Sequence, residues 1–575
     1  MVAEPISAAQ TPRWGMKIGG ERVLLLVAAL YVGGLSLWPL IRLFAEAFAS
    51  DDGQVLGLLT RIWLSKATQR ALANTLEASL ISSLISVALG SALALLTVLS
   101  DLRAKTAMVF TFLLPWLIPP QITAMAWAEL AGPGSPILKP LGLAPAPGTT
   151  NPLYSGWGVA LVMGVEHAAL AFLAVRAGLS AVPGNLIEAA RIGGAKPWAI
   201  LRRIILPVLR APLLAGAALA FVSAIGNFGV PALLGIPGRY PTLTTLIYQR
   251  LNGFGPKVLG EVAALALILA VLAAFGLAIR AFLANRARFS LERGTPLKPF
   301  TLGRWRLPVE SLCWFVLVTI AVLPLLSLIA AAVVPAVGVE LSPASVTMRN
   351  FTHVLVEQAS TQRAFLNSFL LAASAAILSA AFALPLAWLL VFRRSRTARV
   401  LDLIADAPYA VPGIVLSIGI ILVFLKPLPI IGVTLYGTLG ILLLAYVARF
   451  FALALRPVVA GLESLDRSYE EAGQIAGATL MQRLRLIVLP LAAPSAAAGA
   501  LMVFLTAFNE LTVSALLWST GNETLGVIVF QLQYEGNSPA ASAVAVITVI
   551  VTLGAATLFD RLGRHLPAGV VPWRS

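Results

Sequence analysis

The sequence predicts an all-α polytopic membrane protein with about twelve transmembrane helices, arranged as two tandem parallel six-helix halves. Three observations predict this fold class. Of the 575 residues, 59% are hydrophobic and only 11% are charged, whereas soluble domains carry about 25% charged residues. Apolar runs of spanning length recur along the chain, and its second half repeats landmarks of its first half. We therefore expect a lipid bilayer to be the natural solvent of this chain.

The predicted spans are apolar runs of about 20 residues or more, which is the length that crosses the hydrocarbon core of a membrane as a helix. Several contain Gly and Pro, which transmembrane helices tolerate because neighbouring helices satisfy the freed backbone groups. In chain order, the predicted spans are 23–44, 71–99, 107–130, 155–181, 208–232, 258–284, 308–335, 364–392, 400–425, 435–460, 491–517 and 538–560.

The basic residues indicate how the chain is oriented. A formal net charge of +16 could suggest a nucleic-acid partner, but Lys and Arg lie in short gaps between apolar runs rather than on one surface. We therefore expect no nucleic acid. With a cytoplasmic N-terminus, most of the Lys and Arg residues fall in cytoplasmic gaps, as the positive-inside rule requires. An even number of spans then makes the C-terminus cytoplasmic as well.

A polar, basic stretch containing Pro and Gly, residues 286–307, is predicted to be a cytoplasmic linker. It separates a first six-helix domain, residues 1–285, from a second, residues 308–575. The two domains share landmarks at an offset of 293 residues early in each half and 283 later, because the loop at 131–154 is longer than its counterpart. The matched pairs are Pro115 with Pro408, Pro119 with Pro412, Glu188 with Glu471, and Pro207 with Pro490.

Each half begins on the same side of the membrane, so the halves are parallel repeats related by an axis along the membrane normal. We expect a pathway between them. The longest cytoplasmic gap in each half carries one recurring motif, in which Gly follows Glu by six residues and Pro follows it by nineteen. Its key residues are Glu188, Ala189, Ala190, Gly194 and Ala195, and then Glu471, Ala472, Gly473, Gly477 and Ala478.

Small residues allow a short helix to lie close to a partner, Glu favours a helix N-terminus, and the Gly can end the helix. The motif resembles the EAA loop of permeases of binding-protein-dependent ABC importers, in which each domain has six helices of the type I arrangement. Gly473 departs from the pattern, where Ala is usual, and we expect it to loosen its helix by about 0.5 to 1 kcal/mol. Ordinary amphipathic loops are the alternative interpretation of both copies.

The resemblance implies that each motif helix sits in a groove of a cytoplasmic ABC ATPase, so that two copies imply two ATPase subunits. It also implies a periplasmic solute-binding protein and a place in the bacterial inner membrane. No segment matches the P-loop pattern GxxxxGK[ST], so we expect no cofactor in this chain and expect ATP-Mg to bind the partner ATPase. Three scattered His residues and one Cys provide no metal site and no catalytic constellation, which argues against a membrane enzyme.

The fused arrangement resembles the permeases for ferric iron most closely, which makes ferric iron the expected solute. The segments that carry this resemblance are 228–235 (FGVPALLG), 509–511 (NEL) and 534–536 (YEG). Thiamine, phosphonate, polyamine or another small solute is the alternative within the family. A secondary transporter of the major-facilitator type is a more distant alternative, but residues 100–106 (SDLRAKT) lack its glycine-flanked basic loop.

Ionisable residues inside a membrane are costly and mark candidate pathways. Glu166 lies in the fourth predicted span, and an offset of 283 places Arg449 at the equivalent point of the tenth. Asn227 and Glu510 are related by the same offset. We expect Glu166 and Arg449 to lie near one another and to line or gate the pathway, with a buried structural ion pair as the alternative. Asn227 and Glu510 could face the path or bond between helices.

Overall fold

The computed structural model describes residues 20–48, 56–253, 257–286, 299–427 and 432–562. Within these ranges the protein is helical and contains no strand, only an isolated bridge between Ser100 and Phe300. Ten of the described helical stretches are long and apolar enough to cross a membrane, and two bent helix pairs bring the number to twelve. The predicted fold class is thus confirmed. The middle of the predicted linker, residues 287–298, lies outside the described residues.

The helices of the first half follow the predicted spans. They are α1 (Gly20–Val32), α2 (Trp38–Phe48), α3 (Gly57–Leu64), α4 (Lys66–Leu99), α5 (Lys105–Leu117), α6 (Pro120–Ala131), α7 (Gly156–Ser180), α8 (Gly184–Ile192), α9 (Pro197–Ile200), α10 (Leu206–Gly226), α11 (Leu243–Leu251) and α12 (Val258–Arg286). Wide π-helical turns join α1 to α2 and α9 to α10, so each of these pairs is one continuous stretch.

The second half repeats this order. Its helices are α13 (Arg306–Leu317), α14 (Leu323–Ala332), α15 (Arg349–Thr352), α16 (Ala359–Val391), α17 (Arg396–Ala410), α18 (Gly413–Phe424), α19 (Leu439–Glu463), α20 (Ser468–Ile475), α21 (Leu480–Arg483), α22 (Leu489–Phe508), α23 (Ser514–Leu517), α24 (Leu525–Tyr534) and α25 (Ser538–Leu562). Here π-helical turns join α13 to α14 and α21 to α22.

Two predicted spans, 107–130 and 400–425, are not straight helices. Each is a pair of helices, α5 with α6 and α17 with α18, bent by 104° and 108°. The break lies just before Pro119 in the first pair and just before Pro412 in the second. A proline disfavours helical backbone in the residue before it, and Ile118 and Val411 are accordingly extended. The matched prolines therefore mark the same break in both halves.

Two other predicted spans were too long. Helix α10 ends at Gly226 rather than at 232, and α22 ends at Phe508 rather than at 517. Both ends lie at equivalent points of the repeat. The apolar residues that follow form short irregular turns and helices instead of continuing the span. Hydropathy predicts that these residues are buried, but it does not predict the direction of their backbone.

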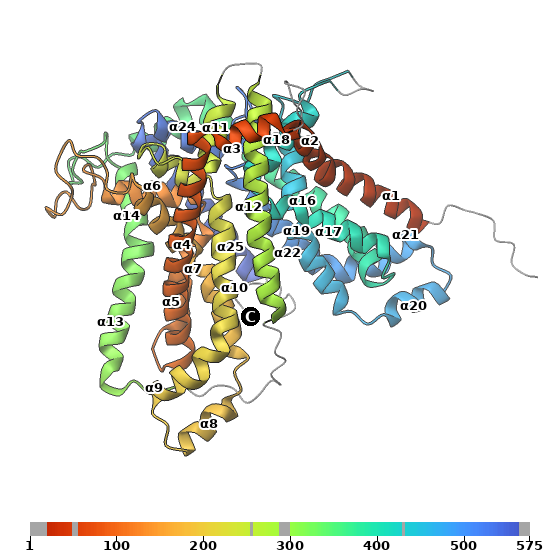
Figure 1. Cartoon of the computed structure of the whole chain (residues 1–575), viewed down its shortest axis with the longest axis horizontal. Helices are drawn as coiled ribbons and strands as arrows, with labels where there is room; N and C mark the ends of the chain where they lie inside the picture. The colour runs from red at the N-terminus through yellow and green to blue at the C-terminus, as the bar shows by residue number, and fades with distance from the viewer. Residues whose placement is uncertain (1–19, 49–55, 254–256, 287–298, 428–431, 563–575) are drawn as a thin grey trace, which may run out of the picture.

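The first helices of the two halves are exchanged in space. Helices α1 and α2 pack against α16, α17 and α18 of the second half, while α13 and α14 pack against α5 and α6 of the first. In Figure 1, α1 accordingly lies on the right beside α16 and α17, and α13 lies on the left beside α5. Each half is therefore completed by the first helix of the other, which sequence repeats alone did not predict.

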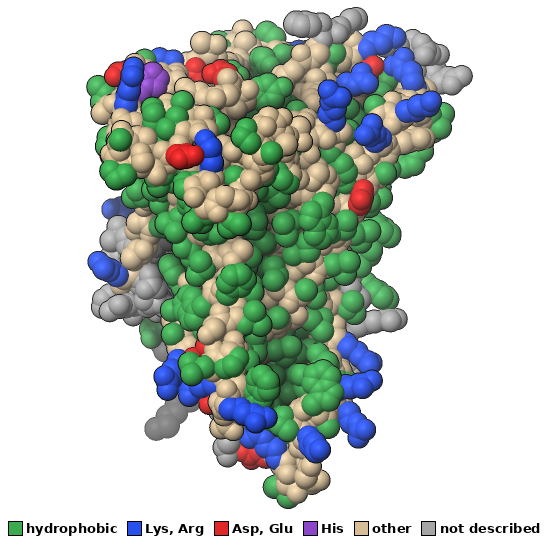
Figure 2. Space-filling model, turned by 90° about the vertical axis from the view of Figure 1, so that its left-hand side faces the viewer, with side chains coloured by type: hydrophobic (Ala, Val, Ile, Leu, Met, Phe, Trp, Pro, Cys, Tyr) green, Lys and Arg blue, Asp and Glu red, His purple; other side chains and the backbone are tan. Residues whose placement is uncertain are grey.

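The outer surface supports a membrane location. In Figure 2, Lys and Arg gather near the two ends of the visible face, and a broad belt of hydrophobic side chains separates them. Small residues allow the helices inside this belt to pack closely. At Gly90 of α4, an added Cβ would lie only 2.5 Å from the backbone oxygen of Ala168 in α7. Such close approach is typical of helix packing in membranes, where small residues bring backbones together.

Candidate functional site

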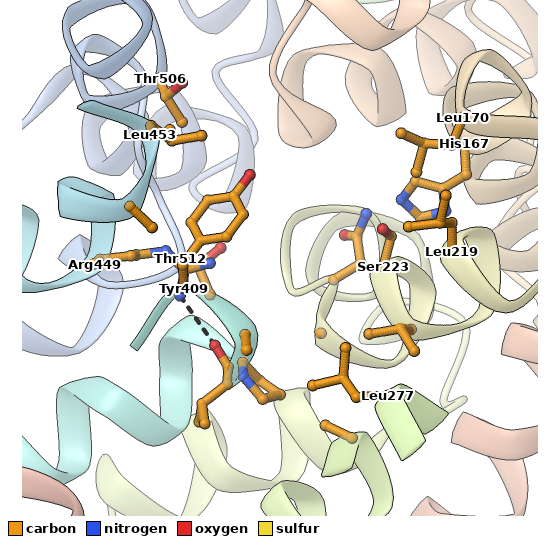
Figure 3. A pocket seen from close by; sticks show the side chains of 18 of the residues that line it. His167, Leu170, Leu219, Ser223, Leu277, Tyr409, Arg449, Leu453, Thr506 and Thr512 are labelled. Carbon is orange, nitrogen blue, oxygen red and sulfur yellow. Dashed lines mark hydrogen bonds between the residues drawn. The ribbon is translucent and has the colours of Figure 1, made fainter. Parts of the chain in front are cut away.

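A cavity of about 620 Å³ lies between the two halves. Most of its lining comes from α7, α10 and α12 on one side and from α17, α19, α22 and the segment after α22 on the other. Figure 3 shows the two groups facing one another, with His167, Leu219 and Ser223 on one side and Tyr409 and Arg449 on the other. Glu166 and Arg449, the two charged residues singled out in the sequence, both line this cavity.

The broken spans contribute to the lining of this cavity. Pro120, at the start of α6, and Pro412, just before α18, both line it together with Gly226 and Asn227. Three charged residues, Arg280, Asp406 and Arg456, line it as well. Their charge is partly neutralised, because Arg456 pairs with Asp402 at 3.0 Å and also with Asp406.

Glu166 in α7 is buried, with an exposed fraction of 6%. Its Oε2 accepts a hydrogen bond of 3.2 Å from the Asn227 side chain, and the neighbouring His167 places Nε2 3.8 Å from Oε1. The His167 side chain is also buried, and its Nδ1 has no hydrogen-bond partner within the described structure. One wall of the cavity thus carries a carboxylate that is incompletely hydrogen-bonded.

Arg449 in α19 occupies the equivalent place in the second half. Its Nη1 lies 3.5 Å from the carbonyl oxygen of Val411, at the break between α17 and α18. The guanidinium fills a notch that only glycine leaves open, because a Cβ on Gly413 would lie 2.5 Å from Nη1. Among the described residues, Arg449 forms no ion pair within 4.0 Å, either with Glu166 or with another carboxylate. The alternative of a direct Glu166–Arg449 ion pair is therefore wrong for this conformation.

Asn227 is the C-cap residue of α10, and Glu510 lies two residues after the end of the equivalent helix α22. The Asn227 side-chain oxygen accepts from the Val230 N–H at 3.1 Å. The Glu510 carboxylate accepts from the N–H groups of Val513, at 2.9 Å, and Ser514, at 3.1 Å. Asn227 lines the cavity, whereas Glu510 is buried and is not among the lining residues. Both side chains therefore accept hydrogen bonds from the turn that follows the helix, and of the two only Asn227 also lines the cavity.

The first motif forms helix α8 and its C-terminal cap. Gly194 adopts a positive φ of 75°, the Ala195 N–H donates to the carbonyl of Ala190, and the Gly194 N–H donates to that of Arg191. These bonds form a Schellman motif, which explains the fixed position of the glycine. The expectation that Glu188 begins the helix is wrong, because it is the fifth residue of α8. Ala189 is exposed at the surface.

The second motif forms α20 with the same cap. Gly477 has a φ of 78°, and the Ala478 N–H donates to the Gly473 carbonyl. Glu471 lies in the first turn of α20, as predicted for this copy, and Ala472 is exposed. Gly473 does not interrupt the helix. It is buried at the point where α20 contacts the turn after α21.

Sequence reasoning missed the most exposed apolar residues of these elements. Ile192 at the end of α8 and Ile475 at the end of α20 are equivalent in the repeat and are 89% and 88% exposed. Trp198 and Met481 form a second equivalent pair and are also exposed. The signal was present in the sequence as apolar residues at matching positions in two polar gaps. Their exposure in both halves indicates a surface that a partner covers.

Comparison with known proteins gives the family. A model described as binding-protein-dependent transport system inner membrane component matches residues 86–289 and again 375–571, which together exceed half the chain. A probable ABC transporter permease of Sinorhizobium fredii is 28% identical over 460 residues, 78% of this chain and 79% of the relative.

Two further relatives differ in the solute named for them. An Fe(3+)-transport system permease of Haemophilus influenzae is 26% identical over 68% of this chain and 74% of its own length. A sulfate transport system permease of Salmonella typhimurium is 32% identical over 33% of this chain and 74% of its own length. The chain belongs to the family of binding-protein-dependent transport system inner membrane components and is a fused double permease of an ABC transporter.

Proposed function

We propose that this permease passes ferric iron from a periplasmic binding protein to the cytoplasm, driven by two ABC ATPase subunits bound to α8 and α20. The cavity between the halves is the observation that carries the proposal. Residues from both halves, including those at the two proline breaks, line this one cavity, so a relative movement of the halves can alter it. In this proposal the chain lies in the bacterial inner membrane with both termini in the cytoplasm, a placement that the distribution of basic residues supports.

The motif helices are the proposed docking elements. Ile192 and Ile475 expose apolar side chains to water, and burying each against a partner would be favourable by about 1.5 to 3 kcal/mol. Gly194 and Gly477, both with positive φ, end the two helices with the same Schellman cap. Two equivalent surfaces on one chain suit two copies of one ATPase. ATP and Mg bind on those subunits, since this chain has no P-loop.

The proposal of ferric iron rests on the ferric permease among the relatives and on oxygen groups in the cavity. Glu166, Tyr409 and Ser223 supply carboxylate and hydroxyl oxygens, the ligands that hard cations prefer. A transported ion needs only passing contacts rather than a closed coordination shell. Within the described residues there is no group of three or more His, Cys, Asp or Glu side chains placed to hold a metal ion.

An anionic solute of the sulfate or phosphonate kind is the second candidate. Arg449 and Arg280 line the cavity, and neither forms an ion pair among the described residues. Guanidinium groups favour oxyanions, because their donors match the geometry of sulfate and phosphate oxygens. The sulfate permease among the relatives supports the same alternative. Because the chain belongs to a family of ABC transporter permeases, the alternative of a secondary transporter of the major-facilitator type is discarded.

Uptake by proteoliposomes tests the proposal. The chain is reconstituted with its ATPase subunits, ATP is enclosed, and binding protein loaded with radioactive ferric iron is added outside. We expect iron to accumulate only when ATP and binding protein are both present. Accumulation of radioactive sulfate or 2-aminoethylphosphonate in place of iron would establish the anionic alternative.

A further inference from the structure

The two motif helices are anchored to the protein by different interactions. In the first half, Ile187 of α8 and Ile200 at the end of α9 are buried, with exposed fractions of 3% and 1%, in one hydrophobic cluster. The repeat offset of 283 places Glu470 of α20 and Arg483 of α21 at these two positions. Both are buried as well, at 9% and 6%. An apolar anchor in one half thus corresponds to an ionic anchor in the other.

The ionic anchor is a short and direct contact. Arg483 Nη1 donates to Glu470 Oε1 at 2.6 Å, and side-chain exposure is only 7% and 11%. Hydrogen bonds between charged groups are stronger than neutral ones and have stricter geometry. Loss of one partner from a buried pair leaves the other charge buried without compensation, which is strongly destabilising. The pair therefore fixes α20 relative to α21 more strictly than two isoleucines would.

The second motif departs from the usual pattern at Gly473, and this residue lies against the same ionic anchor. Gly473 replaces the alanine found at Ala190 in the first half. A Cβ at residue 473 would lie 2.6 Å from Ile487 Cδ1 and 3.3 Å from Arg483 Cγ. The glycine thus leaves room for Ile487 and, next to it, for the stem of Arg483. The substitutions at positions 470, 473 and 483 are three parts of one local arrangement.

We propose that Glu470 and Arg483 are positioning residues that hold the second motif helix, α20, in its docking geometry, whereas the equivalent positions in the first half carry the apolar pair Ile187 and Ile200. The inference rests on the proposed function for what α20 docks on, but not for the anchor itself. Loss of charge at positions 470 and 483 should therefore disturb α20, a sensitivity that the equivalent positions of the first half lack. Figure 1 shows that α20 and α21 lie apart from α8 and α9, so the two anchors can be altered separately.

The first test uses the full chain alone. Cys313 is the only native cysteine, so a Cys313→Ser background allows spin labels at two introduced cysteines, Ile192→Cys and Ile475→Cys. We expect a narrow distance distribution between the labels, which broadens in Arg483→Ile and narrows again in Glu470→Ile/Arg483→Ile. The exposed neighbour Arg485 supplies the matched control, Arg485→Ile, with no broadening. Equal distributions in the single and double variants would overturn the proposal.

The second test uses the complex with ATPase subunits in proteoliposomes. Arg483→Ile and Glu470→Ile should each lower binding-protein-stimulated ATP hydrolysis on the order of tenfold, because a buried charge is left unpaired. The double isoleucine variant and the exchanged pair Glu470→Arg/Arg483→Glu should restore it to within about twofold. Failure of both double variants to restore activity refutes the positioning role. If the Ile475→Cys variant cannot be crosslinked to the ATPase even with the anchor intact, the docking proposal fails, while the distance measurement still judges the anchor.

Discussion

At the scale of single residues, equivalent positions of the two halves carry different charges. Glu166 faces the cavity where the second half has Arg449, and Asn227 stands where the second half has Glu510. The backbone roles are nonetheless shared, because Asn227 and Glu510 both accept N–H groups of the turn that follows. Sequence alignment of the halves predicted these pairs. It could not predict that Glu510 is buried without lining the cavity, since that depends on where α22 ends.

Replacing Glu510 by Ala should destabilise the protein. The N–H groups of Val513 and Ser514 would lose their acceptor inside the protein, at a cost of about 1 to 3 kcal/mol for each. Glu510→Gln keeps one acceptor oxygen and should be affected less. Thermal unfolding in nanodiscs measures both variants. A Glu510→Ala protein as stable as the unaltered chain would show that these bonds are dispensable.

Replacing Glu166 tests whether the cavity that it lines is the transport pathway. In Glu166→Ala we expect assembly with the ATPase to be retained and ATP-dependent uptake to fall by on the order of tenfold, as for a polar group that acts in transport. Arg449→Met should do the same, and both are measured beside complex formation on size-exclusion chromatography. Normal uptake by a correctly assembled Glu166→Ala variant would end the gating hypothesis.

At the scale of elements, the sequence predicted which segments cross the membrane better than how they run. Apolar length identified the ten helical stretches of spanning length and the two bent helix pairs of the described residues. It did not identify the bends of 104° and 108°, although Pro119 and Pro412 had been matched between the halves. A proline within an apolar run is compatible with a kinked, continuous helix or with a break, and neighbouring helices decide between them. The anchor at Glu470 and Arg483 was missed because a charged pair in a polar gap resembles a solvated one.

The close contact between Gly413 and the Arg449 guanidinium, at the break between α17 and α18, leads to a prediction. Gly413→Ala places a Cβ 2.5 Å from Arg449 Nη1, so the guanidinium must move from the Val411 carbonyl. We expect uptake to fall several-fold while the protein still assembles, because the flexible end of Arg449 can move aside but its charge then occupies another place in the cavity. Gly554→Ala is the matched control, since nothing lies within 4 Å of its added Cβ. Equal uptake by the two variants would contradict the importance of the notch.

At the scale of the whole molecule, the halves are held together by exchange of their first helices and by contacts near the linker. The loop after α4 meets the segment before α13, where the Leu302 N–H donates to the Asp101 carboxylate at 2.9 Å and Arg306 lies 3.7 Å from it. The Phe300 N–H also donates to the Leu99 carbonyl. These contacts fix the start of the second half against the first, which explains how a fused chain keeps the two halves in register.

These contacts predict a pH dependence. The hydrogen bond from the Leu302 N–H, then that from the backbone of Asp101 itself and then the charge of Arg306 lower the pKa of Asp101 below its usual value. A carboxyl group with a lowered pKa stabilises the folded state above its unfolded pKa, near 3.9, and loses this effect as pH falls through the folded pKa. The difference in melting temperature between the unaltered chain and Asp101→Ala should therefore be constant above about pH 5 and shrink below about pH 4. A difference that grows on acidification would contradict this assignment.

The central claim is that both motif helices face the cytosol and are covered there by an ATPase. Labelling of Ile192→Cys and Ile475→Cys, each in the Cys313→Ser background, with a membrane-impermeant maleimide tests it most directly. We predict labelling in inside-out vesicles but not in right-side-out vesicles, and protection of both positions when the ATPase subunits are bound. Labelling of either cysteine from the periplasmic side, or equal labelling with and without the ATPase, would contradict the account.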